Sequence, residues 1–453
     1  MSTKKNVIKF IAVLTLIIIP VFGSMSVLAS PTKSDFSQAV TQPWRHVSSF
    51  SGNSIAMLNP NDGWMILNAG TRAFLHHWDG TTWRLWGEIT HSQDIVRSDI
   101  QMISETDGWI VLGGPLGQGA ESAIYRWNGY TWTHFETLTD PNEISFNSLH
   151  LVAETDGWAS AFFAFGTYLY HWNGSTWRRE ETIWISENLL DRIHMVSSTD
   201  GWAIGESIYR FDGTDWTESG SPVDQWLNAI DMISINDGWV VGEEGKILHW
   251  DGSSWTSVPS PTTQDLTEVS MASSDHGWAI GGGNSGPNVL IHWDGSSWTQ
   301  LDSPTNAKLY DITLVSEYDG WLTSGWSSSE SYGTFRFNPT SLEINHNSGA
   351  IGSYFNVVGE GFPPNTTTTI SINNQVIFPT LTTDESGNIQ FTLNTDSADP
   401  GVYYVTVSVN PESTSRFILS SDEPQHPLEG SFYLLDVPEG IALQEVYLPL
   451  LIK

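Results

Sequence analysis

Four carboxylates in this sequence have the type and spacing that glycoside hydrolysis requires. Glycosidases use two carboxyl groups, about 5–10 Å apart, as acid and as base or nucleophile. Four acids occur in or beside short alternating apolar segments of an internal repeat, which would bring them to the mouth of a shared channel: Asp99, Asp231, Glu268 and Asp311. Because the chain contains 51 Asp and Glu residues, many pairs arise by coincidence. The four acids therefore define a candidate hydrolase site and no more.

Two histidines, His150 and His194, lie in the same kind of segment, in consecutive repeats. A zinc site needs further ligands at about 2 Å, and no third ligand accompanies this pair. The chain has no cysteine, which excludes disulfides and thiolate metal sites. We expect these histidines to be polar channel-lining residues, and we expect neither a metal nor a cofactor.

The tryptophans are more informative about ligand binding. Most of the 23 tryptophans recur at fixed repeat positions, but Trp184, Trp226 and Trp326 fall in predicted loops. An exposed loop tryptophan is typical of a contact surface, and its flat face suits a sugar ring or a peptide side chain. Arg192 and Gln225 are near in sequence and are predicted to add polar contacts. Trp86, also outside the repeated positions, is expected to extend an outer strand.

The repeat that would position these residues has a period of about 40 residues, which is typical of a β-propeller with one repeat per blade. Ile235–Pro259 reads as strands separated by turns at two Asp-Gly pairs and at Glu243–Gly245. The chain contains seven Asp-Gly-Trp or His-Gly-Trp tryptophans: Trp64, Trp109, Trp158, Trp202, Trp239, Trp278 and Trp321. The sequence therefore predicts an all-β, seven-bladed β-propeller.

The outermost strand of the last blade is missing from the end of the repeat region. Six repeats have a tryptophan in that strand: Trp83, Trp132, Trp177, Trp216, Trp255 and Trp298. The last repeat ends at Phe337 without one, whereas Trp44 precedes the first repeat. We predict that the segment around Trp44 pairs as the outer strand of the last blade, which closes the ring and removes two open sheet edges.

The two ends of the chain differ from the repeat region. Residues 1–29 have the basic start, apolar run and small-residue cleavage site of a signal peptide. A polar lead-in over 30–42 follows, and the propeller is predicted over 43–338. Residues 339–421 contain several short alternating strands, which favours a small Ig-like β-sandwich. A tail over 422–453 ends in the apolar residues Val446–Lys453. This apolar end is too short to span a bilayer.

The net charge of −33 excludes nucleic acid and anionic membrane surfaces as the expected partners, since both require a basic surface. We expect an exported protein, extracellular or on the cell surface, that acts as a monomer without a membrane span after removal of the signal.

The repeat DGWVVGEEGKILHWDGSSW resembles the BNR or Asp-box-like propeller repeats of exported bacterial proteins. It is similar in pattern to the photosystem II assembly factor-like and sialidase-like superfamilies. Residues 339–421 resemble the Ig-like modules of bacterial surface proteins. The resemblance implies binding or scaffolding as often as catalysis. The arginines needed for a sialidase site are not gathered here, because Arg126, Arg210 and Arg336 recur at one repeat position.

Three functions remain open from the sequence. The first is a non-catalytic binding protein whose propeller face takes a glycan or an extracellular protein. The second is a glycan-active hydrolase that uses the four channel acids. The third is an assembly or scaffolding factor that holds a protein partner on the same face.

Overall fold

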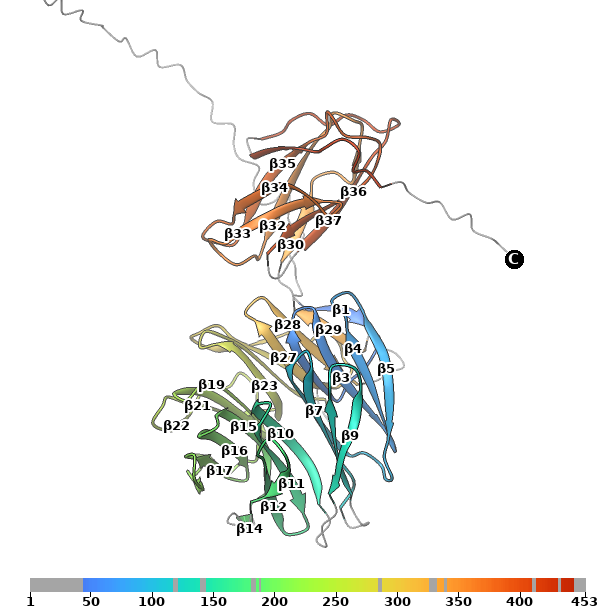
Figure 1. Ribbon diagram of the computed structural model, residues 1–453. Helices are drawn as coiled ribbons and strands as arrows, with labels where there is room; N and C mark the ends of the chain where they lie inside the picture. Colours follow the sequence, from blue (N-terminus) through green and yellow to red (C-terminus); the bar gives the residue numbers. More distant parts are fainter. Residues whose placement is uncertain are drawn as a thin grey trace, which may run out of the picture. The chain divides into compact units, whose positions relative to one another are not determined.

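The computed structural model describes most of the chain between Trp44 and Leu443 (Figure 1). The described ranges are 44–116, 121–138, 144–180, 185–186, 189–283, 287–325, 332–337, 340–409, 413–430 and 433–443. The predicted signal peptide and lead-in, the apolar end of the tail, and two predicted binding residues, Trp184 and Trp326, lie outside these ranges. Those predictions remain predictions.

The described strands before residue 338 form sheets of four successive antiparallel strands, numbered here sheet 1 to sheet 7. Sheets 1 to 3 contain β2 (Ser54–Asn59), β3 (Asp62–Ala69), β4 (Arg72–Trp78) and β5 (Trp83–Thr90); β6 (Arg97–Ser104), β7 (Asp107–Gly113), β8 (Ser122–Trp127) and β9 (Trp132–Leu138); and β10 (Ser145–Ala153), β11 (Asp156–Phe163), β12 (Gly166–Trp172) and β13 (Trp177–Arg179), with β14 (Ile185–Ser186) beside β12.

Sheets 4 to 7 repeat the same order. They contain β15 (Leu190–Ser197), β16 (Asp200–Gly205), β17 (Ile208–Phe211) and β18 (Trp216–Glu218); β19 (Leu227–Ser234), β20 (Asp237–Gly242), β21 (Ile247–Trp250) and β22 (Trp255–Ser257); β23 (Leu266–Ser273), β24 (His276–Gly282), β25 (Asn288–Trp293) and β26 (Trp298–Leu301); and β27 (Leu309–Ser316), β28 (Asp319–Ser324), β29 (Thr334–Phe337) and β1 (Trp44–Ser48).

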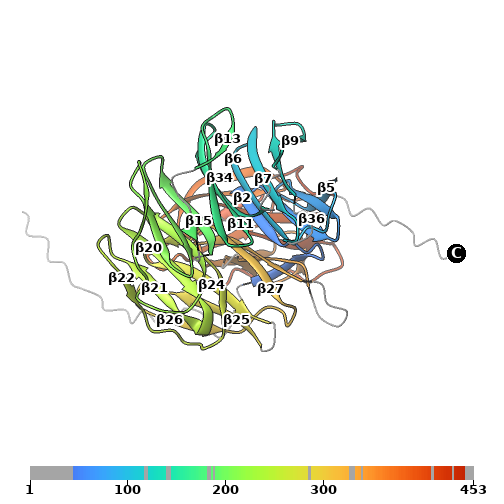
Figure 2. The same cartoon turned by 90° about the horizontal axis from the view of Figure 1, so that it is seen from below.

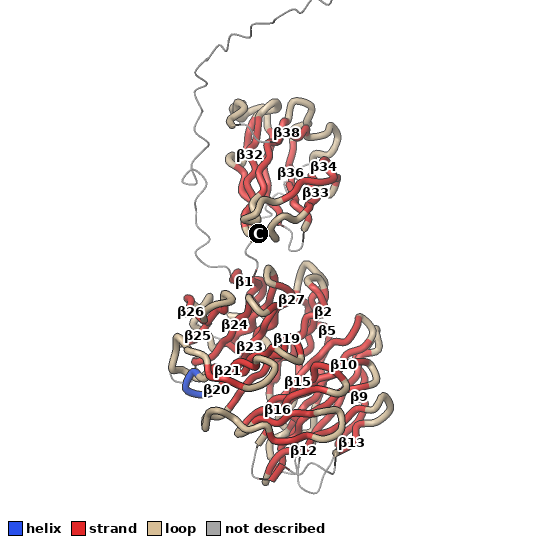
Figure 3. Tube along the Cα trace, turned by 90° about the vertical axis from the view of Figure 1, so that its left-hand side faces the viewer, coloured by secondary structure: helices blue, strands red, loops and turns tan. Residues whose placement is uncertain are grey.

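The first strand of each sheet lies innermost, and Figures 2 and 3 show the sheets side by side around a common centre. Each inner strand contacts the inner strand of the next sheet, and β27 of sheet 7 contacts β2 of sheet 1. This arrangement of repeated four-stranded sheets is a β-propeller.

The strand β1 completes sheet 7, as the sequence predicted. It pairs antiparallel with β29, with Trp44 opposite Phe337 and Arg45 opposite Arg336. The first and last parts of the repeat region therefore share one sheet, and β29 does not present an open edge.

Tryptophans join each sheet to the next in the same way. In sheet 5, the ring of Trp239 lies 4.7 Å from Trp293 and 5.5 Å from Trp298 of sheet 6, the latter at an interplanar angle of 79°. The same edge-to-face contact joins Trp44 to Trp278 and Trp83 to Trp321, which are the two joints that involve sheet 7. Each such aromatic pair stabilises the fold by about 0.5–1.5 kcal/mol, in addition to the contribution of its buried apolar area.

The sequence predicts a turn at the Asp-Gly pair that precedes the second-strand tryptophan in six of the repeats, and this prediction is wrong. In sheet 5 the turn is formed by Ile235 and Asn236, whereas Asp237 and Gly238 already belong to β20. Gly238 does not adopt a positive φ. It packs instead against Met232 on the paired strand, whose thioether would have to move to make room for a Cβ.

The second Asp-Gly pair of the repeat is a turn, as predicted. Gly252 has φ of 89°, and Asp251 Oδ1 accepts hydrogen bonds from Ser253 N at 2.8 Å and Ser254 N at 2.9 Å. The Ser253 hydroxyl and these amides lower the pKa of Asp251 to about 2. The carboxylate therefore stays ionised and holds the turn. The Glu243–Gly245 turn is also present, as a short 3₁₀ segment (η2).

The remaining described strands form two sheets around a separate core. One contains β30 (Ser341–Ile344), β32 (Tyr354–Glu360), β35 (Ile389–Asn394) and β38 (Tyr433–Asp436); the other contains β31 (Ser348–Gly349), β37 (Ser413–Leu419), β36 (Gly401–Ser408), β33 (Thr367–Ile372) and β34 (Gln375–Thr382). Phe355, Phe391, Tyr403 and Phe417 are fully buried between them. The strand β38 pairs with β35, so this β-sandwich includes a strand from the segment that the sequence analysis assigned to the tail. Within the described ranges, no helix has the length and apolar character needed to cross a membrane.

Candidate functional site

The register of the inner strands places alternate side chains on the channel side in two rings. In each sheet, one inner-strand residue pairs with the second-strand residue that lies two positions after the Asp-Gly-Trp or His-Gly-Trp tryptophan. These inner-strand residues form one ring, which we call the acid ring: Ser54, Asp99, Ser148, Arg192, Ala229, Glu268 and Asp311. The inner-strand residues that pair with the tryptophan itself form the other ring, which we call the histidine ring: Ala56, Gln101, His150, His194, Asp231, Ser270 and Thr313. Members of the two rings are two residues apart, so they point to the same side of each strand.

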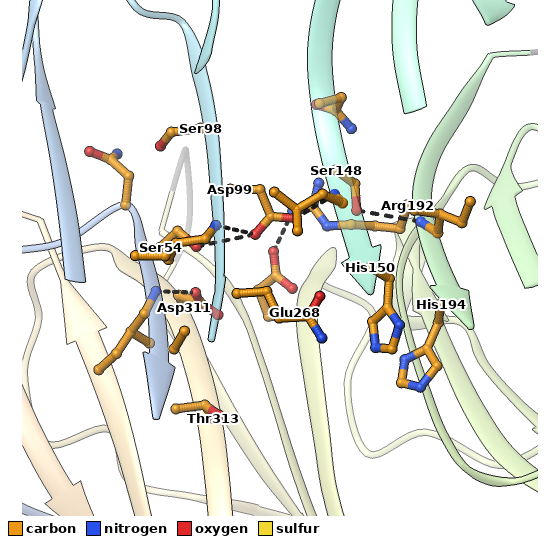
Figure 4. Close-up of a pocket in the computed structure, with 18 of the residues that line it drawn as sticks. Ser54, Ser98, Asp99, Ser148, His150, Arg192, His194, Glu268, Asp311 and Thr313 are labelled. Carbon is orange, nitrogen blue, oxygen red and sulfur yellow. Dashed lines mark hydrogen bonds and ion pairs between the residues drawn. The ribbon is translucent and has the colours of Figure 1, made fainter. Parts of the chain in front are cut away.

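A cavity of about 350 Å³ lies among these rings. Figure 4 shows Asp99, Glu268 and Asp311 on one side of it, and His150 with His194 on the other. Three of the four predicted acids, together with both histidines, line this cavity, and Asp231 follows directly after the lining residue Ile230. The inner strands thus bring the predicted acids to one region of the channel.

Three of the acids connect neighbouring sheets. Asp99 Oδ2 accepts a hydrogen bond of 2.9 Å from Leu149 N of sheet 3. Asp231 Oδ2 accepts one of 2.6 Å from Met271 N of sheet 6. Asp311 Oδ2 accepts one of 2.8 Å from Ile55 N, which joins sheet 7 to sheet 1. In each of these three cases, a carboxylate from the preceding sheet satisfies a backbone N–H of the next inner strand.

Neutral side chains make the same connection elsewhere in the channel. His150 Nδ1 accepts a hydrogen bond of 3.2 Å from Met195 N, and Ser270 Oγ accepts one of 2.9 Å from Leu314 N. Gln101 both accepts from Leu151 N and donates to Leu151 O. Amide, imidazole and hydroxyl groups of the histidine ring therefore accept the same kind of hydrogen bond that the carboxylates accept.

Glu268 differs from the other acids because its partner lies across the channel. Arg192 Nη2 of sheet 4 donates to Glu268 Oε1 of sheet 6 over 2.6 Å. The sheet between them has Ala229 at this level, whose small side chain leaves room for the guanidinium. The side chains of Arg192 and Glu268 are 30% and 19% exposed, so channel solvent reaches this ion pair although protein surrounds it.

Burial shifts the pKa values of the charged groups in the channel. Burial raises the pKa of Asp99 and of Asp231. The pKa of Asp311 is raised well above its ordinary value, first by burial and then by the carboxylates of Glu268 and Asp99. Burial also raises the pKa of Glu268, although Arg192 acts in the opposite direction. Such shifts occur at catalytic acids and in structural networks alike.

The two predicted channel histidines stack on each other with ring centres 4.2 Å apart. Burial lowers the pKa of both imidazoles, and that of His150 well below its ordinary value. His194 Nδ1 lies 3.7 Å from Asp231 Oδ1. Within the described residues, no group of three or more histidine and acidic side chains is arranged to hold a metal ion.

A second cavity, of about 560 Å³, contains the predicted binding residue Trp226. The other lining residues are Glu206, Ser207, Ser221, Val223, Asp224 and Glu243. Gln225, the neighbouring predicted residue, donates from Nε2 to Glu244 Oε2 over 3.1 Å. Arg192, predicted to act with these residues, lines the channel cavity and pairs there with Glu268. Trp86 belongs to β5, as expected, and is 50% exposed.

Four residues that line the cavities carry no motif of their own in the sequence: Ser54, Gln101, Glu206 and Glu243. Ser54 and Gln101 could have been found by counting back from each repeat tryptophan to the paired inner-strand position. The sequence gives no comparable indication for Glu206 and Glu243. They follow the second strands of different sheets and line one cavity only in the folded chain.

No family model matches the chain, and no curated protein matches it. Among solved structures, the chain is similar to YCF48 bound to a D1 peptide, at 15% identity and a TM-score of 0.49, over 66% of this chain and 96% of that chain. It is also similar to YCF48 from Cyanidioschyzon merolae, at 16% identity and a TM-score of 0.46, over 65% and 98% of the two chains. The WD40 propeller domain of Doa1 is similar at 9% identity and a TM-score of 0.48, over 65% and 94%. A fold shared at such identities does not imply a shared ligand.

Proposed function

We propose that this chain is an exported, non-catalytic binding protein whose propeller holds a protein or glycan partner on one face. That face, called the loop face here, carries the turns between second and third strands and the connections from each outer strand to the next sheet. The observation that carries the proposal is the use of the channel carboxylates as connections between sheets, which leaves them poorly suited to catalysis.

A catalytic carboxylate must present an oxygen to the substrate or to water. Both oxygens of Asp311 accept backbone hydrogen bonds, from Ile55 N and from Ile312 N. Both oxygens of Asp99 are likewise occupied, by Leu149 N and by Ile100 N together with Ser54 Oγ. These bonds support a structural role for the two acids.

A hydrolase remains the second candidate because of Glu268 and the raised pKa of Asp311. Glu268 Oε1 accepts from Arg192, and no hydrogen bond to its second oxygen is present among the described residues. A carboxyl group kept protonated by burial beside an ionised one is the arrangement that glycosidases use.

The loop face supports the binding function. In an up-and-down four-stranded sheet, the start of the inner strand and the end of the second strand lie at the same edge. Trp226 and Glu243 occupy those places in sheet 5, and a cavity opens beside them. Partly exposed tryptophan at a cavity is typical of a contact site.

We further propose that the propeller sheets are the seven blades of a closed ring and that the second domain is Ig-like. The edge-to-face tryptophan joints at both sides of sheet 7 support ring closure. The hydroxyl of Tyr403 donates to Asp399 O over 2.6 Å, as in the tyrosine corner of Ig-like sandwiches. Export rests on residues 1–29 of the sequence.

Binding and hydrolysis can be separated with one pair of variants. Trp226→Ala removes a loop-face tryptophan, and Trp86→Ala removes a half-exposed tryptophan from an outer strand. We expect partner capture from the source organism's extracellular fraction, or binding on a glycan array, to be lost only in Trp226→Ala. We expect no release of reducing ends from a polysaccharide panel. Hydrolysis that disappears in Glu268→Gln, with unchanged thermal stability, would reject the binding function in favour of the hydrolase.

A further inference from the structure

The cavity at Trp226 is also lined by three acidic residues from separate loops. Glu206 follows β16, Asp224 precedes β19, and Glu243 begins the turn after β20. Glu206, Asp224 and Glu243 are exposed, whereas Trp226 is partly buried. The volume of about 560 Å³ falls in the range of ligand sites and is ample for a long side chain.

The backbone at this cavity is held in place before any ligand arrives. Trp226 O accepts a hydrogen bond of 2.9 Å from Glu243 N. This approach is close enough that a Cβ on Gly242 would overlap Trp226 O. The next residue, Glu244, adopts a left-handed φ of 53°, and its amide donates to Asp265 Oδ1 over 2.9 Å. A preorganised site loses less conformational entropy on binding.

The negative charge of the cavity is not neutralised within the described part of the chain. Among the described residues, no Lys, Arg or His forms an ion pair with Glu206, Asp224 or Glu243. This contrasts with the acids at the start of the second strands, such as Asp200 and Asp319, which pair with Arg210 and Arg336. The cavity therefore has an excess of negative charge beside Trp226.

We propose that this cavity binds a cationic side chain, the guanidinium or ammonium group of an arginine or lysine in a protein partner. The charged head lies among the three carboxylates, while its aliphatic stem covers the indole of Trp226. This assignment rests on the proposed binding function and names its ligand class. The net charge of −33 speeds the approach of such a partner, and the effect declines with salt.

The probe that tests the assignment is a short labelled glycine-rich peptide with two arginines, compared with the same peptide carrying neutral citrulline instead. We expect the arginine peptide to bind the wild-type protein about tenfold more tightly. Trp226→Ala and the double variant Asp224→Asn/Glu243→Gln each lower this affinity by about fivefold or more. Trp86→Ala leaves it unchanged.

A second double variant controls for non-specific attraction to an acidic protein. Glu105→Gln/Asp275→Asn removes the same charge from turns on the opposite face, where both side chains are exposed, and is expected to bind as wild type does. Equal binding of the arginine and citrulline peptides, or equal loss in both double variants, overturns the assignment. If partner capture still depends on Trp226 in that case, the proposed binding function stands and only the ligand class is wrong.

Discussion

One position of the repeat shows how a single residue changes the chemistry of a sheet. In six sheets the residue before Gly-Trp is an aspartate that pairs with a histidine or arginine of the third strand, as Asp237 does with His249 at 2.8 Å. In sheet 6 this residue is His276, whose Nδ1 lies 3.2 Å from His292 Nε2. Two histidines at this distance cannot both be protonated without repulsion.

This difference makes sheet 6 sensitive to acid. Burial, followed by the charge of His292, lowers the pKa of His276 to about 4, and burial lowers that of His292. In the unfolded chain a histidine titrates near 6.5. At pH values between about 4 and 6.5, the unfolded state binds more protons than the folded state. The free energy of unfolding therefore decreases as the pH falls through this range.

His276→Asn should reduce this acid sensitivity. Asparagine has the shape of the aspartate found in the other sheets and does not titrate. We expect little change in thermal stability at pH 8 and a relative gain of about 1–2 kcal/mol at pH 5, measured by denaturant unfolding at both values. An equal effect at the two pH values would show that the pair does not control acid stability.

At the scale of strands, the sequence repeat predicted the β-strands and their order correctly. It predicted the role of one glycine, Gly238, incorrectly. The strand order and the second Asp-Gly turn were predictable because tryptophan, Asp-Gly and alternation recur at fixed spacing. The first Asp-Gly pair looks identical in sequence, yet Gly238 lies within β20 and packs against Met232. A glycine in a turn and a glycine in a strand that faces a neighbour's side chain cannot be told apart without the pairing register.

The glycine that ends the second strand has a similar steric role. A Cβ on Gly242 would overlap Trp226 O, and one on Gly281 would overlap Asp265 O, because the connection into the inner strand crosses the strand end. Gly242→Ala should therefore destabilise the propeller by about 1–3 kcal/mol and displace Trp226. Gly87→Ala in β5 is the matched control, since no atom lies within 4 Å of its added Cβ. Differential scanning calorimetry measures both, and equal melting temperatures would contradict the steric role.

At the scale of the whole molecule, the channel connections and tryptophan joints hold successive sheets together. Ring closure through Trp44 was predictable because six repeats have an outer-strand tryptophan and the last one lacks it. The contents of the two cavities were not predictable. Arg192 meets Glu268 from another sheet, and the carboxylates near Trp226 come from three loops, so only the folded ring reveals their proximity.

We propose above all that Asp99, Asp231 and Asp311 connect sheets and do not catalyse. The most direct test is the thermal stability and glycan hydrolysis of Asp99→Ala and Asp99→Asn. The alanine variant leaves Leu149 N without its acceptor and should lose about 1–3 kcal/mol, whereas the amide oxygen of asparagine still accepts and restores most of that loss. Neither variant should change activity on a polysaccharide panel. An asparagine variant that keeps wild-type stability but loses a measured hydrolytic activity would contradict the account, because the carboxylate itself would then be doing the chemistry.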